Sequence, residues 1–412
     1  MRIVYLNHYA GSPLLGMEYR PYYLAREWVR AGHRLQVLAA DFSHVRSTQP
    51  AAGDAVIDGI DYRFYATPRY AGNGVARVKN IVAFLRAVWA DTPRLVRDFN
   101  PNVVIASSTY PLDIWVARRI ARLSRAKLVF EVHDLWPLSP IELSGMSRWH
   151  PFALLCQAAE VAAYRDADVV VSMLPKVQGH MASRGLDLRK LHIVPNGITL
   201  DEWQLEGQGE DQGETPALRG DVAQALAAAR AAGRTVVGYA GSMGLPNALD
   251  TLLDAAALLR DEPLQFVLVG GGHEQVRLVQ RVTDEGLPNV QFLPPIPKAQ
   301  VPSFLAGVDI AYIGWQRVPI YRFGIAPNKL MDYMMARCPV LHAVEAGNDP
   351  VAEAGAGLTV APQSPSAVAE GLRKLAATPT AERSAMGDRG RAFVLAHHTY
   401  PVLAQRFLDA VQ

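Results

Sequence analysis

Short apolar runs rich in β-branched residues alternate with helical stretches along almost the whole chain. Segments with the apolar spacing of helices are Tyr19–Ala31, Val75–Ala90, Asp113–Leu123 and Phe152–Arg165. The runs between them predict buried strands: Arg2–Leu6, Leu35–Ala39, Val103–Ala106, Leu128–Val132 and Val169–Ser172. Such alternation predicts an α/β fold, with a parallel sheet covered by helices on both faces. Near Val56–Tyr65, Asp58-Gly59 predicts a small inserted hairpin.

A change of composition divides the chain near residue 200. Asp201–Glu214 holds six acids, no Lys or Arg and three glycines, which is typical of a linker or surface loop. The alternation then restarts, with strands expected at Val236–Ala240, Phe266–Val269, Val290–Leu293, Ile310–Ile313 and Val340–His342. Helices are expected at Ala248–Leu259, Gln275–Glu285 and Lys329–Ala336. We therefore predict domains at 1–198 and 199–380, with C-terminal helices at 381–412 that pack back on the first domain.

Composition excludes several classes of protein. Lys and Arg number 41 against 39 Asp and Glu, so no general attraction to nucleic acid is expected. Cys156 and Cys338 form no metal or redox spacing, which favours a reducing, cytoplasmic setting. The chain has no apolar run long enough to cross a bilayer.

Doubly wound domains bind ligands at the carboxyl ends of their strands, and we expect two such domains to face a shared cleft. The first such loop, Asn7–Met17, contains Gly11 and Gly16, which suit close approach to a phosphate or a plain structural turn equally. His133-Asp134 follows another expected strand directly. This pair indicates either a polar site or a core histidine capped by a turn.

The second half has two glycine-rich turns after strands, at Gly241-Ser242-Met-Gly244 and Gly270–Gly272. A dinucleotide site would need a third glycine in the first turn and an acid about 20 residues further on, and neither is present. These turns therefore argue against NAD chemistry but allow a phosphate or pyrophosphate.

Pro327-Asn328-Lys329 begins a predicted helix with a cation in its first turn. Positive charge is unfavourable at a helix N-terminus, and a bound anion would remove the conflict. The alternative is an ordinary solvated lysine. Asp332, one turn later, suits first-turn stabilisation equally well.

Cations are concentrated in one part of the first domain. Between Arg63 and Lys127 there are twelve Lys or Arg and three acids. In the helix after Arg77, the apolar residues among the cations are Ile81, Phe84, Leu85 and Trp89. This pattern is typical of a helix on an anionic membrane surface, or of an amphipathic helix packed on its own sheet with a basic outer face.

Five segments together carry a resemblance to a known family: Gly16–Trp28 with Gly32-His33, Glu131–Pro137, Val194–Ile198, Gly241–Gly244 and Pro327–Tyr333. On these residues the chain resembles glycosyltransferase family 4, retaining enzymes of the GT-B fold, over nearly its whole length. It is most similar to the bacterial branch that includes N-acetyl-L-fucosamine transferases. The resemblance implies two Rossmann-like domains facing a central cleft.

The resemblance also implies roles for individual residues. Backbone amides at Gly16 would meet the donor pyrophosphate, His133 would face the transferred sugar, and Ile296 would meet the base. Asp332 would hold the ribose hydroxyls, although the first acid usually paired with it falls on Gly324. The cations usual after the first strand of the second domain fall on Ser242 and Asn247, and Lys329 is the expected substitute.

These considerations predict a metal-independent, retaining transfer of a sugar, of the N-acetylated amino or deoxyamino class, from a UDP-sugar without a cofactor. The acceptor would be a lipid-linked glycan of surface polysaccharide biosynthesis at the cytoplasmic face of the membrane. The catalytic residues would be His133 and Lys329. Substrate-binding residues would be Gly16, Met17, Arg20, Asp134, Gly241, Ser242, Gly272, Ile296, Asn328, Leu330 and Asp332. A UDP-sugar epimerase of the same fold and a non-catalytic nucleotide-sugar-binding protein are the alternatives.

Overall fold

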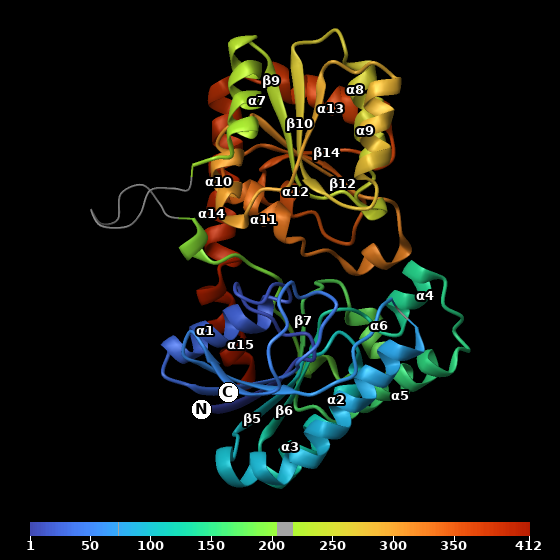
Figure 1. Ribbon diagram of the computed structural model, residues 1–412, viewed down its shortest axis with the longest axis vertical. Coiled ribbons are helices and arrows are strands. Elements are labelled where there is room, and N and C mark those ends of the chain that lie inside the picture. Colours follow the sequence, from blue (N-terminus) through green and yellow to red (C-terminus); the bar gives the residue numbers. More distant parts are fainter. Residues whose placement is uncertain (73, 204–216) are drawn as a thin grey trace. The chain divides into compact units, whose positions relative to one another are not determined.

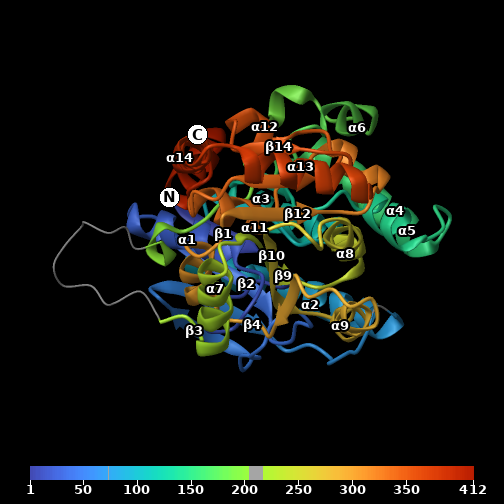
Figure 2. The ribbon, with the colours of Figure 1, turned by 90° about the horizontal axis from the view of Figure 1, so that it is seen from above.

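The computed structural model describes residues 1–72, 74–203 and 217–412. The chain forms two compact units: unit 1 comprises Met1–Asn196 and Tyr400–Gln412, and unit 2 comprises Gly197–Thr399. Each unit contains one sheet with helices packed on it (Figures 1 and 2). Most of the acidic segment predicted as a linker lies outside the described residues.

The sheet of unit 1 has the strand order β3-β4-β2-β1-β5-β6-β7-β8. Its strands are β1 (Arg2–Leu6), β2 (Arg34–Ala40), β3 (Gly53–Ile57), β4 (Ile60–Tyr65), β5 (Val103–Ala106), β6 (Lys127–Val132), β7 (Val169–Ser172) and β8 (Leu191–Ile193). All neighbours pair in parallel except β3 and β4. That antiparallel pair is the predicted hairpin, and Asp58 and Gly59 at its turn have φ of 51° and 78°. Two consecutive residues with positive φ are what a two-residue hairpin of this kind requires.

Helices cover both faces of the unit 1 sheet: α1 (Arg20–Arg30), α2 (Val75–Arg94), α3 (Ile114–Ser124), α4 (Leu138–Ser144), α5 (Pro151–Asp166), α6 (Gln178–Ser183) and α15 (Tyr400–Val411). Helices α1 and α15 lie side by side (Figure 1). The buried Trp28 of α1 donates its indole N–H to the carbonyl of Ala404 at 3.0 Å and packs its ring on Phe407. The C-terminal helix thereby completes the core of unit 1.

The sheet of unit 2 is wholly parallel, in the order β11-β10-β9-β12-β13-β14. Its strands are β9 (Thr235–Ser242), β10 (Leu264–Gly271), β11 (Val290–Leu293), β12 (Ile310–Gly314), β13 (Val340–Ala343) and β14 (Gly357–Thr359). Buried apolar residues of α7 (Gly220–Ala231), α11 (Asn328–Met335) and α14 (Thr380–His397) belong to one core cluster. A second core cluster contains those of α8 (Leu249–Leu258), α9 (Gln275–Asp284) and α13 (Pro365–Ala377). Two short helices, α10 (Val301–Leu305) and α12 (Pro350–Ala354), complete the unit.

The C-terminal segment differs from the prediction, because its two helices belong to different units. Helix α15 packs in unit 1, but α14 stays in unit 2. Two glycines of α14 allow this close packing. A Cβ on Gly387 would lie 2.1 Å from the carbonyl oxygen of Arg337, and one on Gly390 would lie 3.0 Å from the Ala356 side chain. Larger residues at these positions would force α14 away from the core of unit 2.

Helix α2 corrects one expectation about the basic region. Phe84, predicted at a membrane-facing surface, is fully buried and stacks on the ring of His8 at 4.6 Å. Arg77 lies over the ring of Tyr9 and hydrogen-bonds its hydroxyl at 3.2 Å. Trp89 remains 45% exposed, with the guanidinium of Arg119 stacked 4.5 Å from its ring centre. The helix therefore packs on its own sheet and presents a narrower outer face than predicted.

Candidate functional site

The carboxyl edge of the unit 1 sheet brings polar residues together. Strands β1, β5 and β6 run parallel, and they are followed by Asn7, Ser107 and His133. Leu6 and Ala106 end β1 and β5 in register, whereas β6 continues two residues beyond the position paired with Ala106. The carboxamide of Asn7 donates to the carbonyl of Ser107 at 2.7 Å. Polar side chains at this edge are typical of a ligand site in a doubly wound fold.

A fully buried carboxylate, Glu131, lies at the centre of this edge. Its Oε1 accepts a hydrogen bond from Nε of Arg20 at 2.9 Å, and its Oε2 accepts from the hydroxyls of Tyr5 and Ser107, each at 2.6 Å. Burial alone would raise the pKa of Glu131, but the charge of Arg20 and these hydrogen bonds hold it well below its usual range. Glu131 is thus an ionised, fully hydrogen-bonded buried group.

Arg20 differs from the prediction that it binds substrate. It is 2% exposed, and all three guanidinium nitrogens are used inside unit 1. Nε donates to Glu131, while Nη1 and Nη2 donate to the carbonyls of Pro195 and Val194 at 2.6 and 2.8 Å. Arg20 therefore compensates the charge of Glu131 and holds the carbonyl groups of Val194 and Pro195 at the end of unit 1.

His133 lies against the Glu131 group. Its Nε2 is 2.8 Å from Oγ of Ser107 and 3.4 Å from Oε2 of Glu131, and its Nδ1 is 4.0 Å from Oε1 of Glu18. Burial acts to lower the pKa of His133, but the hydrogen bond and charge of Glu131 prevail and raise it above its ordinary value. An imidazole held on a carboxylate in this way can carry a proton at physiological pH.

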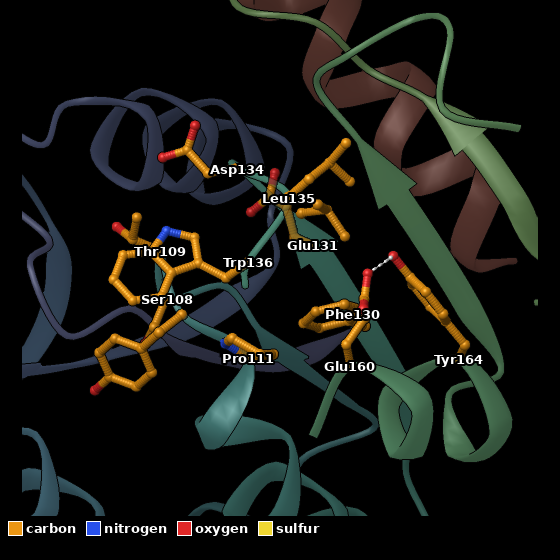
Figure 3. A pocket seen from close by; sticks show the side chains of 12 residues that line it. Ser108, Thr109, Pro111, Phe130, Glu131, Asp134, Leu135, Trp136, Glu160 and Tyr164 are labelled. Atoms are coloured by element: carbon orange, nitrogen blue, oxygen red, sulfur yellow. Dashed lines mark hydrogen bonds between the residues drawn. The ribbon is translucent and has the colours of Figure 1, made fainter. Parts of the chain in front are cut away.

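Asp134 follows His133 and is exposed beside a small pocket of unit 1 (Figure 3). Trp136 and Tyr110 contribute rings to its wall, and the carboxyl group of Glu160 accepts a hydrogen bond from the Tyr164 hydroxyl at 3.1 Å. The full lining is Ser108, Thr109, Tyr110, Pro111, Phe130, Glu131, Val132, Asp134, Leu135, Trp136, Glu160 and Tyr164. The pocket volume of about 10 Å³ has room for no more than one water molecule.

The loop after β1 is a compact turn. Gly16 has φ of +96°, and its N–H donates to the carbonyl of Ser12 at 2.8 Å. A Cβ on Gly11 would lie 1.9 Å from the carbonyl oxygen of Gly16. Both glycines are therefore needed by the turn itself, and the Gly16 amide expected at a phosphate is already bonded. The neighbouring Met17 is half exposed.

In unit 2, Lys329 of α11 reaches the carboxyl end of β9. Its ammonium donates to the hydroxyl of Tyr239 at 2.9 Å and to Oδ1 of Asn247 at 2.7 Å. The Tyr239 hydroxyl itself donates to the carbonyl of Ser242 at 2.5 Å, so it accepts from Lys329. Desolvation lowers the pKa of Lys329 to about 8. An ammonium has three donors, and these are its only two acceptors among the described residues, which leaves one N–H for a ligand.

The glycine-rich turns of unit 2 lie next to this ammonium and to each other. A Cβ on Gly241 would lie 3.2 Å from Nζ of Lys329, and one on Gly270 would lie 1.9 Å from the carbonyl oxygen of Gly241. Gly272 packs equally tightly, because its Cβ would lie 2.4 Å from the carbonyl oxygen of Met243. Gly270 and Gly272 are required for this backbone packing, whereas Gly241 leaves room for the lysine.

The other predicted residues of unit 2 lie in different environments. Asp332 is half-buried and receives a hydrogen bond from Trp203, and desolvation raises its pKa to about 7 despite the nearby Lys298. Leu330 lies in the hydrophobic core, and its N–H donates to the carbonyl of Pro327, so its side chain does not contact a ligand. Asn328 is exposed at the start of α11, and Ile296 is half-buried.

Several relevant residues escaped the sequence reasoning. Tyr239 was not singled out, and Asn247 was noted only as a position where the family has a cation, yet both accept hydrogen bonds from Lys329. A surface hollow at the ends of β12 and β13 is lined by Arg317, Arg322 and Glu345, and Nε of Arg317 pairs with Glu345 at 3.1 Å. Their position directly after strands of a parallel sheet was the available signal.

The described residues contain no group of three or more His, Cys, Asp or Glu arranged to hold a metal ion. One Asp-x-Asp spacing does occur, at Asp166-Ala-Asp168, immediately before β7 and hence at the amino edge of the sheet. Asp166 pairs with Arg118 and Arg165, and Asp168 accepts from the N–H of Leu128. Over the same ranges, no helix combines the length and hydropathy needed to span a bilayer.

Comparison with known proteins agrees with this architecture. Residues 16–197 match the family described as Glycosyl transferase 4-like domain, and residues 234–378 match Glycosyl transferases group 1. The two matches lie in units 1 and 2 respectively and together cover most of the chain. Each half of the chain therefore resembles a glycosyltransferase domain, and two such parallel-sheet α/β units are the architecture of the GT-B fold.

Individual relatives are distant. WcaI of Escherichia coli, which carries the name of a colanic acid biosynthesis glycosyl transferase, is 24% identical over 64% of this chain, and the match spans 63% of its own length. Sucrose-phosphate synthase from Thermosynechococcus elongatus has a TM-score of 0.71 at 17% identity, covering 99% of this chain and 98% of its own. Anabaena HepE, in a structure with UDP-glucose, has a TM-score of 0.65 at 16% identity with the same coverage. These structures share the fold.

Proposed function

We propose that this protein is a retaining glycosyltransferase that moves a sugar from a UDP-sugar to a glycan acceptor without a metal ion. The observation that carries the proposal is the ammonium of Lys329 beside Gly241 at the carboxyl end of β9. It supplies a cation at a strand end where a nucleotide sugar's diphosphate would bind, in a chain of glycosyltransferase ancestry.

Unit 2 binds the nucleotide in this proposal. Lys329 and the turn at Gly241-Ser242 contact the diphosphate, and Asp332 and Ile296 lie toward the nucleoside. HepE, which has this fold, is known in complex with UDP-glucose, and this supports UDP as the nucleotide. An N-acetylated amino or deoxyamino sugar remains the expected sugar class.

The chemistry follows from the charge that develops on the leaving group. As the glycosidic bond to the diphosphate breaks, negative charge grows on the phosphate oxygen, and a fixed ammonium stabilises it. Lys329 is pre-positioned by Tyr239 and Asn247, so little reorganisation is needed during the reaction. Its position on the first turn of α11 adds the positive end of a helix to the same anion.

Unit 1 supplies the second catalytic group. His133 orients the transferred sugar and exchanges a proton with a hydroxyl at the reacting centre, while the exposed Asp134 faces the acceptor. The buried carboxylate of Glu131 stabilises the imidazolium whenever His133 is protonated.

The proposed acceptor is a lipid-linked glycan of surface polysaccharide biosynthesis. The name of WcaI supports a polysaccharide pathway. Unit 1 carries 25 Lys and Arg against 17 Asp and Glu, although the whole chain is nearly neutral. Such an asymmetry favours an anionic membrane surface for unit 1, through exposed residues of α2 such as Lys79, Arg86 and Trp89.

Isothermal titration calorimetry with UDP, GDP, ADP and UMP tests the donor assignment. We expect UDP to bind more tightly than GDP and ADP, because the base is read in unit 2, and more tightly than UMP, because Lys329 needs the second phosphate. Equal affinity for UMP and UDP would refute the role of the lysine, and no binding of any diphosphate would refute the proposed function.

A further inference from the structure

The hydrogen-bond network of Glu131 contains enough information to locate its protons. An ionised carboxylate only accepts hydrogen bonds, so each donor that contacts Glu131 must direct a hydrogen toward it. Tyr5 and Ser107 both approach Oε2 to 2.6 Å, and Arg20 approaches Oε1 to 2.9 Å. Two oxygens at 2.6 Å without a hydrogen between them would repel one another strongly.

Ser107 has a single hydroxyl hydrogen, and Glu131 takes it. Oγ of Ser107 is then left with lone pairs alone toward its other neighbours. Nε2 of His133 lies 2.8 Å from that oxygen, so a favourable contact requires the hydrogen to be on Nε2. The distance of 3.4 Å from Nε2 to Oε2 of Glu131 favours the same placement.

We infer that Ser107 and Glu131 hold neutral His133 as the Nε2–H tautomer, which leaves Nδ1 as the one ring atom that takes up and releases a proton. Nδ1 is directed toward Glu18, on the loop after β1, at 4.0 Å. Ser107 and Glu131 are positioning residues in this arrangement, because they act through His133. That Nδ1 exchanges this proton with a substrate hydroxyl rests on the proposed function, whereas the tautomer itself does not.

The proton exchange is balanced without any other group. A hydroxyl proton passes to the Nδ1 lone pair, giving an imidazolium with hydrogens on both nitrogens, and the reverse step restores the Nε2–H form. Ser107 and Glu131 keep their own protonation states throughout. The charged and titratable groups that act on the ring are Glu131 on β6, Glu18 on the loop after β1, Arg20 on α1 and the adjacent Asp134. Tyr5 on β1 contacts Glu131. Glu131 and Glu18 favour the imidazolium, and Arg20 opposes it.

Long-range ¹H–¹⁵N correlation spectra of the full-length protein, labelled at histidine, report the tautomer directly. His133 is assigned by the signal that disappears in His133→Gln. Spectra are recorded without ligand above the pKa of His133 and across its titration. The variants are Ser107→Ala, Ser107→Thr and Glu131→Gln, and Ser108→Ala is the matched control, because its hydroxyl accepts from the N–H of His8 and lies outside this network.

We expect wild-type His133 to show one protonated nitrogen, Nε2, and one unprotonated nitrogen, Nδ1. Ser107→Ala should give a mixture of both tautomers, Ser107→Thr should restore the wild-type pattern, and Ser108→Ala should not change it. Glu131→Gln should lower the pKa of His133 by about one unit or more, since it removes a neighbouring negative charge. If that variant does not fold, the serine variants still decide the question.

An Nδ1–H signal in the wild type, or an unchanged pattern in Ser107→Ala, would overturn the inference. Neither result depends on turnover. A protein with the expected tautomer that transfers no sugar would refute the proposed function alone, and an active enzyme with the opposite tautomer would refute this inference alone.

Discussion

Replacing Lys329 with alanine should weaken UDP binding by about 1–3 kcal/mol, which corresponds to a dissociation constant roughly 5- to 150-fold larger. The range is that of a hydrogen bond to a charged group in a partly desolvated site. Lys329 is half-buried, and its ammonium is fixed by Tyr239 and Asn247 at 2.9 and 2.7 Å, so little conformational entropy is lost when the anion binds. The upper part of the range is therefore the better expectation.

The pH dependence of UDP binding gives this prediction a second readout. Because the pKa of Lys329 is lowered to about 8, the free protein loses this charge as the pH rises through that value. A bound diphosphate favours the ammonium and raises its pKa, so binding above about pH 8 takes up a proton. UDP affinity should then fall by up to tenfold per pH unit above that point, and Lys329→Ala should abolish the dependence.

A compensating substitution makes the test sharper. Asn247 contacts Nζ directly, so Asn247→Lys in the Lys329→Ala background places an ammonium in the same region and should restore part of the lost affinity. Lys374→Ala, at an exposed position of α13, is the matched control. Calorimetry that finds the UDP affinity of Lys329→Ala equal to wild type, with Lys374→Ala also unchanged, would refute the phosphate contact.

Three further predictions concern other residues. His133→Ala should lower kcat and kcat/KM together by about 100-fold or more and leave the Kd for UDP unchanged, because the nucleotide is assigned to unit 2; full activity in a sugar-transfer assay would make His133 a core residue only. Between about pH 4 and pH 7 the wild type should lose thermal stability as the pH rises, because folding raises the pKa of Asp332 to about 7 and so opposes its ionisation. Asp332→Asn lacks this effect and should become more stable relative to wild type over that range, and parallel curves of Tm against pH for the two proteins would contradict this. Lys79→Glu with Arg86→Glu should weaken the affinity for anionic vesicles by about 2 kcal/mol, roughly 30-fold, in a co-sedimentation assay. Added salt should also weaken vesicle binding by the wild type, and wild-type protein that does not bind such vesicles at low salt would refute membrane association.

Much of the fold was predictable, because short apolar runs that alternate with helical segments indicate buried strands of a parallel sheet. The strands β1, β5, β7 and β11 coincide with the predicted ranges, and Asp58-Gly59 turns the expected hairpin. The short edge strands β8 and β14 were missed, since three residues carry no periodic signal. The separation of α14 from α15 was also missed. It depends on the fit of Gly387 and Gly390 against neighbouring elements, which only three-dimensional packing reveals.

A site residue could be predicted where its side-chain charge is unusual for its place in a predicted element. Lys329 was singled out because a cation is unfavourable at a helix start, and the structure brings it to Asn247. Arg20 was expected at a substrate, yet it neutralises Glu131, because a sequence does not reveal which acid a buried arginine meets. Phe84 was expected at a surface and is core. Arg20 serves charge compensation and Phe84 serves packing, both inside unit 1, although the residue type of each had indicated a binding surface.

Sugar transfer that depends on an acceptor tests the central claim most directly. The protein is incubated with radiolabelled UDP-sugars, with and without lipid-linked glycans extracted from bacterial membranes, and both released UDP and labelled lipid are measured. The account predicts that one UDP-sugar releases UDP and labels the lipid in equal amounts, only when acceptor is present, and that His133→Ala greatly slows both. A UDP-sugar converted to another UDP-sugar without acceptor would identify an epimerase, and UDP-sugar bound but never consumed would identify a binding protein; either result would contradict the account.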